Sequence, residues 1–255
     1  SWLTERHPVE FCHTDVRNAG GVDDDIRSAR PAVVLHLAAQ VAVTTSVVDP
    51  RTDLEVNVLG TFNVLDSLRR CAPEAFFIYA STNKVYGRMD EVGVEERNGR
   101  YALRDLPMGV SESQPLDFHS PYGCSKGAAD QYTLDFHKSY GLRTVTFRQS
   151  CIYGQRQFGV EDQGWVAWFM IAALLGLPLT LYGDGKQVRD LLYVEDLLDL
   201  YDAAIASPDK CSGRSYNVGG GPANTLSLNE LIGFIEKEVG RLPKLAHSAW
   251  RTGDQ

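Results

Sequence analysis

Two uninterrupted apolar stretches constrain the fold of this 255-residue chain more than any other feature. They are AVVLHLAA (Ala32–Ala39) and AFFIYAS (Ala75–Ser81). Such runs are typical of strands buried on both faces, which occur in parallel sheets covered by helices. Helical patterns follow at Asp53–Arg70 and from Ser120 onward, and RTVTFR (Arg143–Arg148) is a further strand pattern. The alternation predicts an open, doubly wound parallel α/β sheet with helices on both faces.

Shorter patterns lie on either side of this core. We expect a strand at Val9–Val16 and a short helix at Asp23–Arg30. Beyond Gly154 the elements are shorter and more mixed, so we divide the chain into a larger lobe, residues 1–154, and a smaller mixed α/β lobe, residues 155–255. In the smaller lobe we expect helices at Asp162–Gly176, Glu195–Ser207 and Leu228–Val239, and strands at Leu179–Leu181, Val188–Val194 and Ser215–Gly219.

A long polar connection separates Gly87 from Ser120. Within it, Asn98-Gly99 stands between VEER and RYAL, which predicts the two-residue turn of a β-hairpin. Loops of this length in a compact domain are usually lids or binding loops. The other interpretation, a solvated surface insertion, remains open from the sequence.

The composition argues against several classes of function. A net charge of −8 disfavours a general nucleic-acid or anionic-membrane surface. The five cysteines are scattered without a C-x-x-C pair, which indicates a reducing compartment rather than a disulfide framework or a zinc site. The longest apolar run, Trp165–Tyr182, is broken by Gly176 and Pro178, so it predicts a helix and a strand rather than a membrane span. We expect a cytoplasmic protein without a metal, a membrane or a nucleic-acid partner.

The segment SPYGCSKGAADQY (Ser120–Tyr132) contains the clearest chemical pattern. Ser120 is a natural N-cap, and the proline after it suits the first helical position. In a helix starting there, Tyr122 and Lys126 lie one turn apart on one face. The same spacing recurs at Tyr182–Lys186 across a Gly-Asp-Gly turn, where the side chains have no reason to converge. Spacing alone is therefore weak support.

The residues expected around Tyr122 give stronger support for a chemical role of the Tyr122–Lys126 pair. Thr82 ends the strand at Ala75–Ser81, and its hydroxyl is expected to face the helix that carries Tyr122 and Lys126. A tyrosine with a pKa near 10 is a poor base, but an adjacent ammonium favours the phenolate, and a hydroxyl can hold the substrate. Since no side chain accepts a hydride, this set predicts oxidation of an alcohol with a nicotinamide cofactor. Ala38 and Ala39 would let a flat cofactor approach the strand end, although tight packing explains them equally well.

These motifs resemble the extended short-chain dehydrogenases/reductases that act on nucleotide sugars. The resemblance rests on Tyr-x-x-x-Lys, STNKVYG, HLAAQ, NVLGTFNVLD, GDGKQVRDLLYVEDL and YNVGG, and LDFHSPYGCSKGAADQY with CIYGQRQFGVEDQGWV is similar to 2-epimerases of CDP-linked sugars in particular. It implies a Rossmann-like fold, NAD as cofactor, and epimerisation of a nucleotide sugar through a transient keto intermediate. It also implies a homodimer or homotetramer and a place in lipopolysaccharide O-antigen synthesis.

The resemblance also assigns roles to individual residues. It implies a catalytic set of Thr82, Tyr122 and Lys126, of which the last two also contact the cofactor. The other cofactor-binding residues would be Asp15, Val16, Ala38, Ala39, Gln40 and Asn57. Substrate-binding residues would be Asn83, Gln163, Gln187, Arg189, Arg251 and Asp254. For the two arginines, a surface salt bridge is the alternative interpretation.

Some positions depart from the family pattern. Related 4,6-dehydratases carry Asp-Glu after the catalytic threonine, whereas this chain has Asn83 and Lys84, which favours an epimerase. Cys151 replaces an asparagine common in relatives, and a packed small residue is the simpler interpretation than a nucleophile. The alternatives that remain are a 4,6-dehydratase, a reductase and a non-catalytic dinucleotide-binding protein.

The glycine-rich phosphate loop of the family is not found in the sequence. We therefore expect that the first βαβ segment, roughly 30 residues or more, is missing, and that the C-terminal side is also shortened. If that segment is truly absent, binding of the cofactor pyrophosphate is expected to fail.

Overall fold

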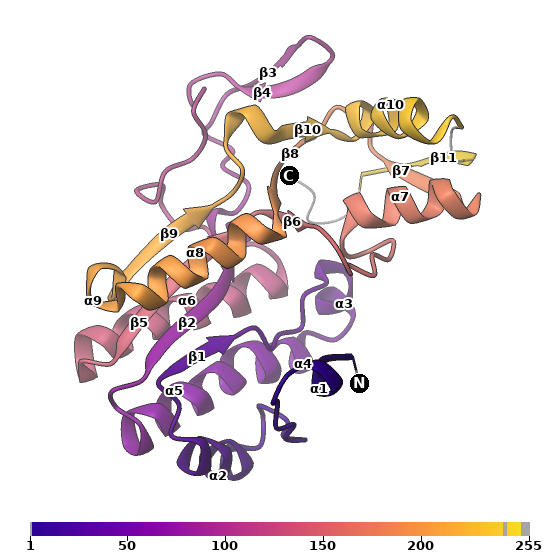
Figure 1. Ribbon diagram of the computed structural model, residues 1–255. Helices are drawn as coiled ribbons and strands as arrows, with labels where there is room; N and C mark the ends of the chain where they lie inside the picture. Colours follow the sequence, from indigo (N-terminus) through magenta and orange to yellow (C-terminus); the bar gives the residue numbers. More distant parts are fainter. Residues whose placement is uncertain (1, 242–243, 251–255) are drawn as a thin grey trace.

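The computed structural model describes residues 2–241 and 244–250, and a four-stranded parallel sheet lies at the centre of its larger lobe (Figure 1). The strand order is β1 (Val33–His36), β2 (Phe76–Thr82), β5 (Arg143–Gln149) and β9 (Arg214–Val218). Each neighbouring pair is parallel. The apolar runs that suggested buried parallel strands thus form β1 and β2.

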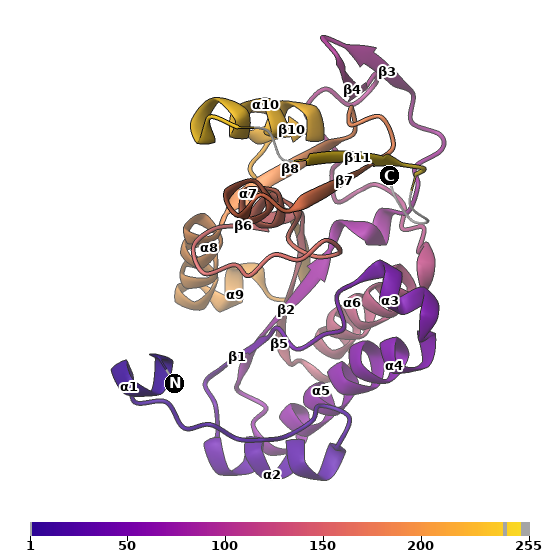
Figure 2. The same cartoon turned by 90° about the vertical axis from the view of Figure 1, so that its right-hand side faces the viewer.

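Helices cover both faces of this sheet (Figure 2). On one face Phe77 and Tyr79 of β2 pack against α2 (Ala19–Ala29), α5 (Gly60–Cys71) and α6 (Ser120–Tyr140). On the other face Phe76 and Ile78 pack against α8 (Val194–Ala206). The alternation along β2 explains why its sequence is apolar at nearly every position. The predicted doubly wound sheet is confirmed.

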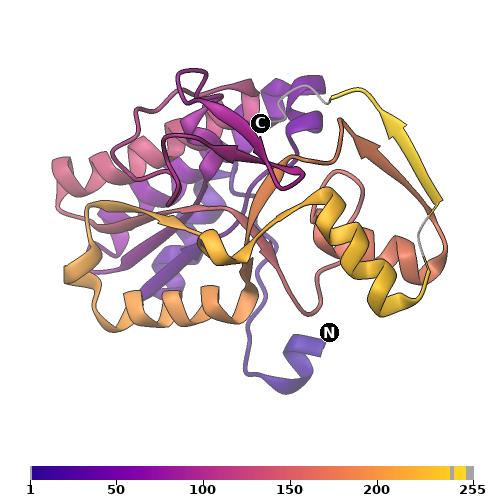
Figure 3. The same ribbon diagram turned by 90° about the horizontal axis from the view of Figure 1, so that it is seen from above.

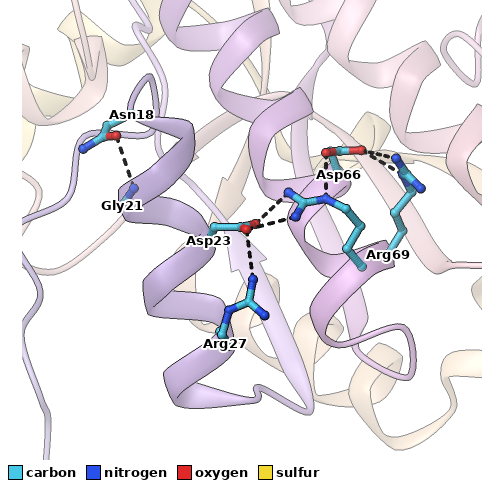
Figure 4. Close-up of polar contacts among 7 residues, drawn as sticks. Asn18, Gly21, Asp23, Arg27, Asp66 and Arg69 are labelled. Carbon is cyan, nitrogen blue, oxygen red and sulfur yellow. Dashed lines mark hydrogen bonds and ion pairs between the residues drawn. The ribbon is translucent and has the colours of Figure 1, made fainter.

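An ion-pair cluster joins α2 to α5 (Figure 4). The Asp23 carboxylate accepts two hydrogen bonds from Arg70, at 2.9 and 2.7 Å, and a third from Arg27. Asp66 in turn pairs with Arg69 and Arg70. This cluster fixes the outer helix α2 against the helix that leads toward the site.

The prediction of a strand at Val9–Val16 is wrong. A short helix, α1 (Trp2–Arg6), is followed by irregular backbone up to the cap of α2. Val9 and Phe11 remain exposed, at 39% and 70%. A strand is stable only when a neighbour pairs with its N–H and C=O groups, and no described strand lies beside this segment.

The smaller lobe contains two further sheets, seen beside the main sheet from above (Figure 3). One is formed by β6 (Cys151–Tyr153), β8 (Val188–Tyr193) and β10 (Thr225–Ser227), and the other by β7 (Pro178–Tyr182) and β11 (Lys244–Ser248). Two helices, α7 (Trp165–Leu175) and α10 (Leu228–Val239), pack together with β7. We keep the proposed division of the chain into two lobes at residue 154, except for two later elements. The helix α8 packs on the main sheet and the strand β9 pairs with β5 of that sheet.

A β-hairpin projects from the long connection after β2. Its strands are β3 (Val94–Arg97) and β4 (Arg100–Leu103), and both turn residues have positive φ, 52° at Asn98 and 77° at Gly99. This is the type I′ turn that the Asn-Gly pair predicted. Two hydrogen bonds hold the hairpin on the smaller lobe. Tyr101 of β4 donates to Asp184 at 2.6 Å, and Lys186 donates to Glu96 of β3 at 2.8 Å. The connection is therefore docked rather than freely solvated.

The remaining elements are short. They are α3 (Val43–Val48), α4 (Pro50–Leu54), the π-helical turn η1 (Glu55–Leu59), α9 (Pro208–Cys211) and the 3₁₀ turns η2 (Asn83–Tyr86) and η3 (Pro222–Asn224). Among the described helices, none is long and apolar enough to cross a membrane.

Candidate active site

The helix α6 begins with an unusual backbone conformation. Ser120 has a φ of 65°, in the left-handed region that residues other than glycine seldom adopt. Ser120 is the first residue of the helix, with His119 rather than the predicted Ser120 at the N-cap, and its hydroxyl accepts a hydrogen bond from the Gly123 N–H at 3.2 Å. The Tyr122 N–H donates to the Ser46 hydroxyl at 3.2 Å. Backbone strain of this kind gathers at functional sites, and here it stands two residues before Tyr122.

Thr82 and Tyr122 meet at the carboxyl end of β2. The Thr82 side chain is near enough to Tyr122 to lower the pKa of its hydroxyl, and the Thr82 oxygen accepts a hydrogen bond from the Lys84 N–H at 3.2 Å. Both side chains are buried. Burial raises the pKa of Tyr122 above its usual value, and the Thr82 side chain offsets this rise only in part. Tyr122 is therefore a phenol at neutral pH in this structure.

Lys126 lies one turn further along α6 and contacts β2. Its Nζ donates to the Ala80 carbonyl at 2.5 Å and stands 4.3 Å from the centre of the Tyr79 ring. Burial lowers the pKa of Lys126 to about 7, while the carboxylates of Asp130 and Asp53 act in the opposite direction. The ammonium thus contacts the strand, whereas sequence reasoning expected its main effect on the Tyr122 phenol.

Asn57 ties the loop after β1 to α6. It lies in the π-helical turn η1, a rare local widening that often occurs at functional positions. Its side chain accepts from the Gln40 N–H at 2.8 Å and donates to the Gln40 carbonyl at 3.0 Å. It also donates to the Ser125 hydroxyl at 3.0 Å. The predicted residues Gln40 and Asn57 are thereby joined to the helix of Tyr122.

Asp15 and Val16 lie beside α5. A Cβ at Gly60 would meet Val16 Cγ2 at 2.6 Å, so the close approach of the two segments requires glycine there. The Asn63 side chain donates to the Val16 carbonyl at 2.9 Å. Asp15 is exposed, and hydrogen bonds from Arg17 lower the pKa of its carboxyl to about 2. Its carboxylate is therefore ionised at neutral pH.

Residues 2–219 match the family model described as "NAD dependent epimerase/dehydratase family". The chain is a member of this family. It is 48% identical over 240 residues to CDP-paratose 2-epimerase of Salmonella typhi, which covers 92% of this chain and 71% of that relative.

Solved structures agree with this membership. The fold matches UDP-glucose 4-epimerase of Thermus thermophilus in complex with NAD at a TM-score of 0.82 and 34% identity, covering 97% of this chain and 74% of that one. It also matches DesIV, the dTDP-glucose 4,6-dehydratase of Streptomyces venezuelae with NAD bound, at a TM-score of 0.78 and 26% identity, covering 96% and 69%. The main sheet of this epimerase/dehydratase family member is thus of the Rossmann type.

NAD is the cofactor of the family, and the residues at the carboxyl edge of the sheet suit it. Ala38 is exposed and small, so a flat ring system can reach the backbone there. Asp15 offers an ionised acceptor for amino or hydroxyl hydrogens, and its partner Arg17 is itself exposed. Tyr122 and Lys126 offer donors for ribose hydroxyls. The chemistry of this donor and acceptor set fits a dinucleotide.

A pocket of about 130 Å³ opens in the smaller lobe of this family member, lined by Trp165, Trp168, Tyr182, Gln187 and Arg189 among others. Gln187 is only 4% exposed. Its Oε1 and both indole N–H groups are buried without a hydrogen-bond partner in the described part of the chain. The walls of the pocket combine aromatic rings with a few polar side chains, which is typical of a ligand site.

The other predicted substrate residues are placed differently. Asn83 is exposed beside Thr82, whose hydroxyl approaches it at 3.5 Å. Gln163 is exposed and pairs through its backbone with Val160. Arg251 and Asp254 lie outside the described residues.

Sequence reasoning missed two groups of site residues. In the sequence, the tryptophans of α7 stand out only as part of an apolar run. The pattern puts Asp53 at the first turn of a helix, where a carboxylate is usually solvated, but α4 begins at Pro50 with Asp49 as its cap. Asp53 is still in the first turn of this helix, yet it is fully buried. The Asp-Pro pair before it was the available signal for the earlier helix start.

Proposed function

We propose that this chain is an NAD-dependent epimerase that converts CDP-paratose into CDP-tyvelose by inverting carbon 2 of the sugar through a transient keto intermediate. The observation that carries the proposal is the 48% identity, over 92% of the chain, to CDP-paratose 2-epimerase. Thr82 at the end of β2 and Tyr122 at the start of α6 support it independently, since two neighbouring hydroxyl groups can handle a substrate hydroxyl.

The residues of the site divide the chemistry between them. Thr82 holds the substrate hydroxyl by a hydrogen bond. Tyr122 takes the proton of that hydroxyl in its phenolate form, which burial makes the minor form in this structure. When bound, NAD supplies a nicotinamide ring that accepts a hydride from the sugar carbon and returns it to the opposite face of the ketone. Tyr122 then gives the proton back to the oxygen. The resemblance gives Lys126 the role of favouring the phenolate form of Tyr122 by its positive charge; in the structure its ammonium contacts the Ala80 carbonyl.

The alternative of dehydration has less support. Elimination of water needs an acid and a base after the catalytic threonine, and these positions are Asn83 and Lys84. The dTDP-glucose 4,6-dehydratase of Xanthomonas campestris is 33% identical, well below the value for the epimerase.

We assign the pocket of the smaller lobe to the nucleotide. Arg189 is suited to the diphosphate because its fork matches phosphate oxygens. Trp165, Trp168 and Tyr182 supply aromatic rings against which a base can pack. Residues 155–255 would thus form most of the substrate lobe.

We further propose a homodimer or homotetramer that pairs through α5 and α6. Leu59, Phe62 and Tyr132 are large apolar side chains exposed at 50%, 37% and 43%, and the Phe62 and Tyr132 rings are in edge-to-face contact across the two helices. Light scattering on the purified chain would test the pairing. The cytoplasmic location and a place in O-antigen synthesis are also proposed, on the resemblance to CDP-sugar 2-epimerases alone.

The test is product analysis with CDP-paratose and NAD. Epimerisation leaves the mass unchanged, dehydration removes one water, and reduction adds two hydrogens. We expect Tyr122→Phe to abolish turnover and to leave NAD binding intact, whereas Tyr140→Phe, at the exposed end of the same helix, keeps full activity. Conversion of a different nucleotide sugar while CDP-paratose stays unchanged would overturn the substrate; turnover by Tyr122→Phe would overturn the mechanism.

A further inference from the structure

The hydroxyl of Thr61, the second residue of α5, makes two hydrogen bonds that the proposed reaction does not explain. It donates to the Asn57 carbonyl at 2.6 Å, and it lies 3.0 Å from Nε2 of His36, the last residue of β1. All three residues are buried, with exposures of 1%, 1% and 5%. A hydroxyl has one proton, and here that proton goes to the carbonyl. The Thr61 oxygen therefore accepts a hydrogen bond from the His36 ring.

This arrangement fixes the protonation of His36. Its Nε2 carries a hydrogen, because only an N–H can donate to the Thr61 oxygen. The ring is stacked on Phe77 and Tyr79 of β2, at centroid distances of 5.6 and 5.9 Å. Burial and the nearby Lys126 charge lower the pKa of His36 to about 3. The ring is thus neutral at pH 7, and its Nδ1 carries no hydrogen.

The carbonyl that accepts from Thr61 lies in the π-helical turn η1 rather than in a regular α-helix. The Gly60 N–H donates to the Glu55 carbonyl, five residues back. A π-turn is rare, and a side chain inserted into the i→i−4 ladder is one cause of such irregularity. Thr133 makes the same kind of bond, to the Ala129 carbonyl at 2.8 Å, yet α6 is a regular helix there. What distinguishes Thr61 is the buried ring N–H on the other side of its hydroxyl.

The π-turn matters because it orients the Asn57 side chain. That amide bonds to the Gln40 backbone at 2.8 and 3.0 Å and donates to the Ser125 hydroxyl at 3.0 Å. The Ser125 hydroxyl in turn donates to the Tyr122 carbonyl at 3.1 Å. A series of hydrogen bonds thus runs from His36 to the first turn of α6. Each residue of an α-helix turns by about 100°, so a shift to regular α-helical register would turn Asn57 away from these partners.

We propose that Thr61 is a positioning residue of the active site: its hydroxyl, held by the His36 ring, stabilises the π-turn that directs Asn57 toward Gln40 and Ser125. The catalytic meaning of this role rests on the proposed function. The hydrogen bonds do not, and they can be measured without NAD or a nucleotide sugar.

The first test is amide hydrogen exchange in Thr61→Val and Thr61→Ser. Valine keeps the branched shape and removes the hydroxyl, whereas serine keeps the hydroxyl. The Gln40 N–H reports on Asn57, because it donates to the Asn57 Oδ1. In Thr61→Val we expect it to exchange about fivefold faster or more, beyond any change at the amides of β2. In Thr61→Ser we expect the wild-type rate.

Thr133→Val is the matched control for this test. It removes an equally buried hydroxyl with the same bond to a carbonyl four residues back, and it should leave the Gln40 N–H unchanged. Three results would overturn the proposal. They are an unchanged Gln40 rate in Thr61→Val, an equal acceleration in Thr133→Val or at the amides of β2, and no recovery in Thr61→Ser.

The second test is made on the wild-type chain, so it does not depend on the folding of a Thr61 variant. The ¹⁵N chemical shifts of the His36 ring identify its tautomer, with His36→Gln identifying its signals. At pH 7 we expect a hydrogen on Nε2 and none on Nδ1; a hydrogen on Nδ1 would overturn the proposal. Failure of the epimerase assay would leave both tests unaffected, so the two proposals can fail separately.

Discussion

Replacing Lys126 by methionine should make the protein more stable while removing a catalytic group. Lys126 is 4% exposed, and burial lowers its pKa from 10.5 to about 7. At 1.36 kcal/mol per pH unit, this shift corresponds to about 5 kcal/mol by which the fold disfavours the ammonium at full protonation, and about 4 kcal/mol at pH 7. The attraction of Asp53 and Asp130 is already included in that shift.

Methionine removes this cost and loses two contacts. The hydrogen bond to the Ala80 carbonyl contributes about 1 kcal/mol, and the interaction with the Tyr79 ring about 1 to 2 kcal/mol. The unbranched methionine side chain fills the space of the lysine stem. The balance is a gain of about 1 to 2 kcal/mol at pH 7, or about 2 to 8 °C in Tm for a chain of this size.

The pH dependence gives the sharper test. Between pH 7 and pH 10.5 the unfolded chain keeps the Lys126 proton while the folded chain has lost it, so wild-type stability rises with pH over this window relative to Lys126→Met. The advantage of the variant should therefore be largest at pH 7 and below, and should vanish above pH 10.5. Urea unfolding of both proteins at several pH values measures it. A variant that is less stable at pH 7, with a difference that stays constant as pH rises, would refute the reasoning.

Two further changes test the packing around the site. In Gly127→Ala the new Cβ would lie 2.3 Å from Cε1 of Phe118, so we expect a loss of about 1 to 3 kcal/mol in urea unfolding, and an unchanged midpoint would show that Phe118 moves freely. Arg148→Met leaves the buried Asp130 without its cation; we expect a loss of about 3 to 5 kcal/mol, partly restored by adding Asp130→Asn. No recovery in the double variant would contradict that charge argument.

The sequence predicted the main sheet and the hairpin because their signals are local. An apolar run such as Ala75–Ser81 has few places in a folded chain except the interior of a parallel sheet. Asn98-Gly99 adopts positive φ at both positions with little strain. The strand at Val9–Val16 failed for the opposite reason. Its alternation is local, but a strand also needs a partner, and pairing is a property of the whole fold.

The site residues stay predictions, and their electrostatics could not be predicted from the sequence. The resemblance named Thr82 and Tyr122, and the structure has them buried at the end of β2 and the start of α6. It could not indicate that the Lys126 ammonium contacts the Ala80 carbonyl, because the direction of a long side chain depends on what surrounds it. The burial of Asp53 results from the packing of α4 against α6, which the sequence pattern does not give.

The buried charges also indicate which contacts serve stability and which serve chemistry. The Asp130–Arg148 pair has its hydrogen bonds satisfied and links α6 to β5, so it acts as a support of the fold. Lys126 has one hydrogen bond and a strongly lowered pKa, and Asp53 keeps an oxygen without a partner among the described residues. A fold selected only for stability would exchange these two residues for a neutral pair. We therefore expect Lys126, one helical turn from Tyr122, to serve the proposed reaction at a cost in stability.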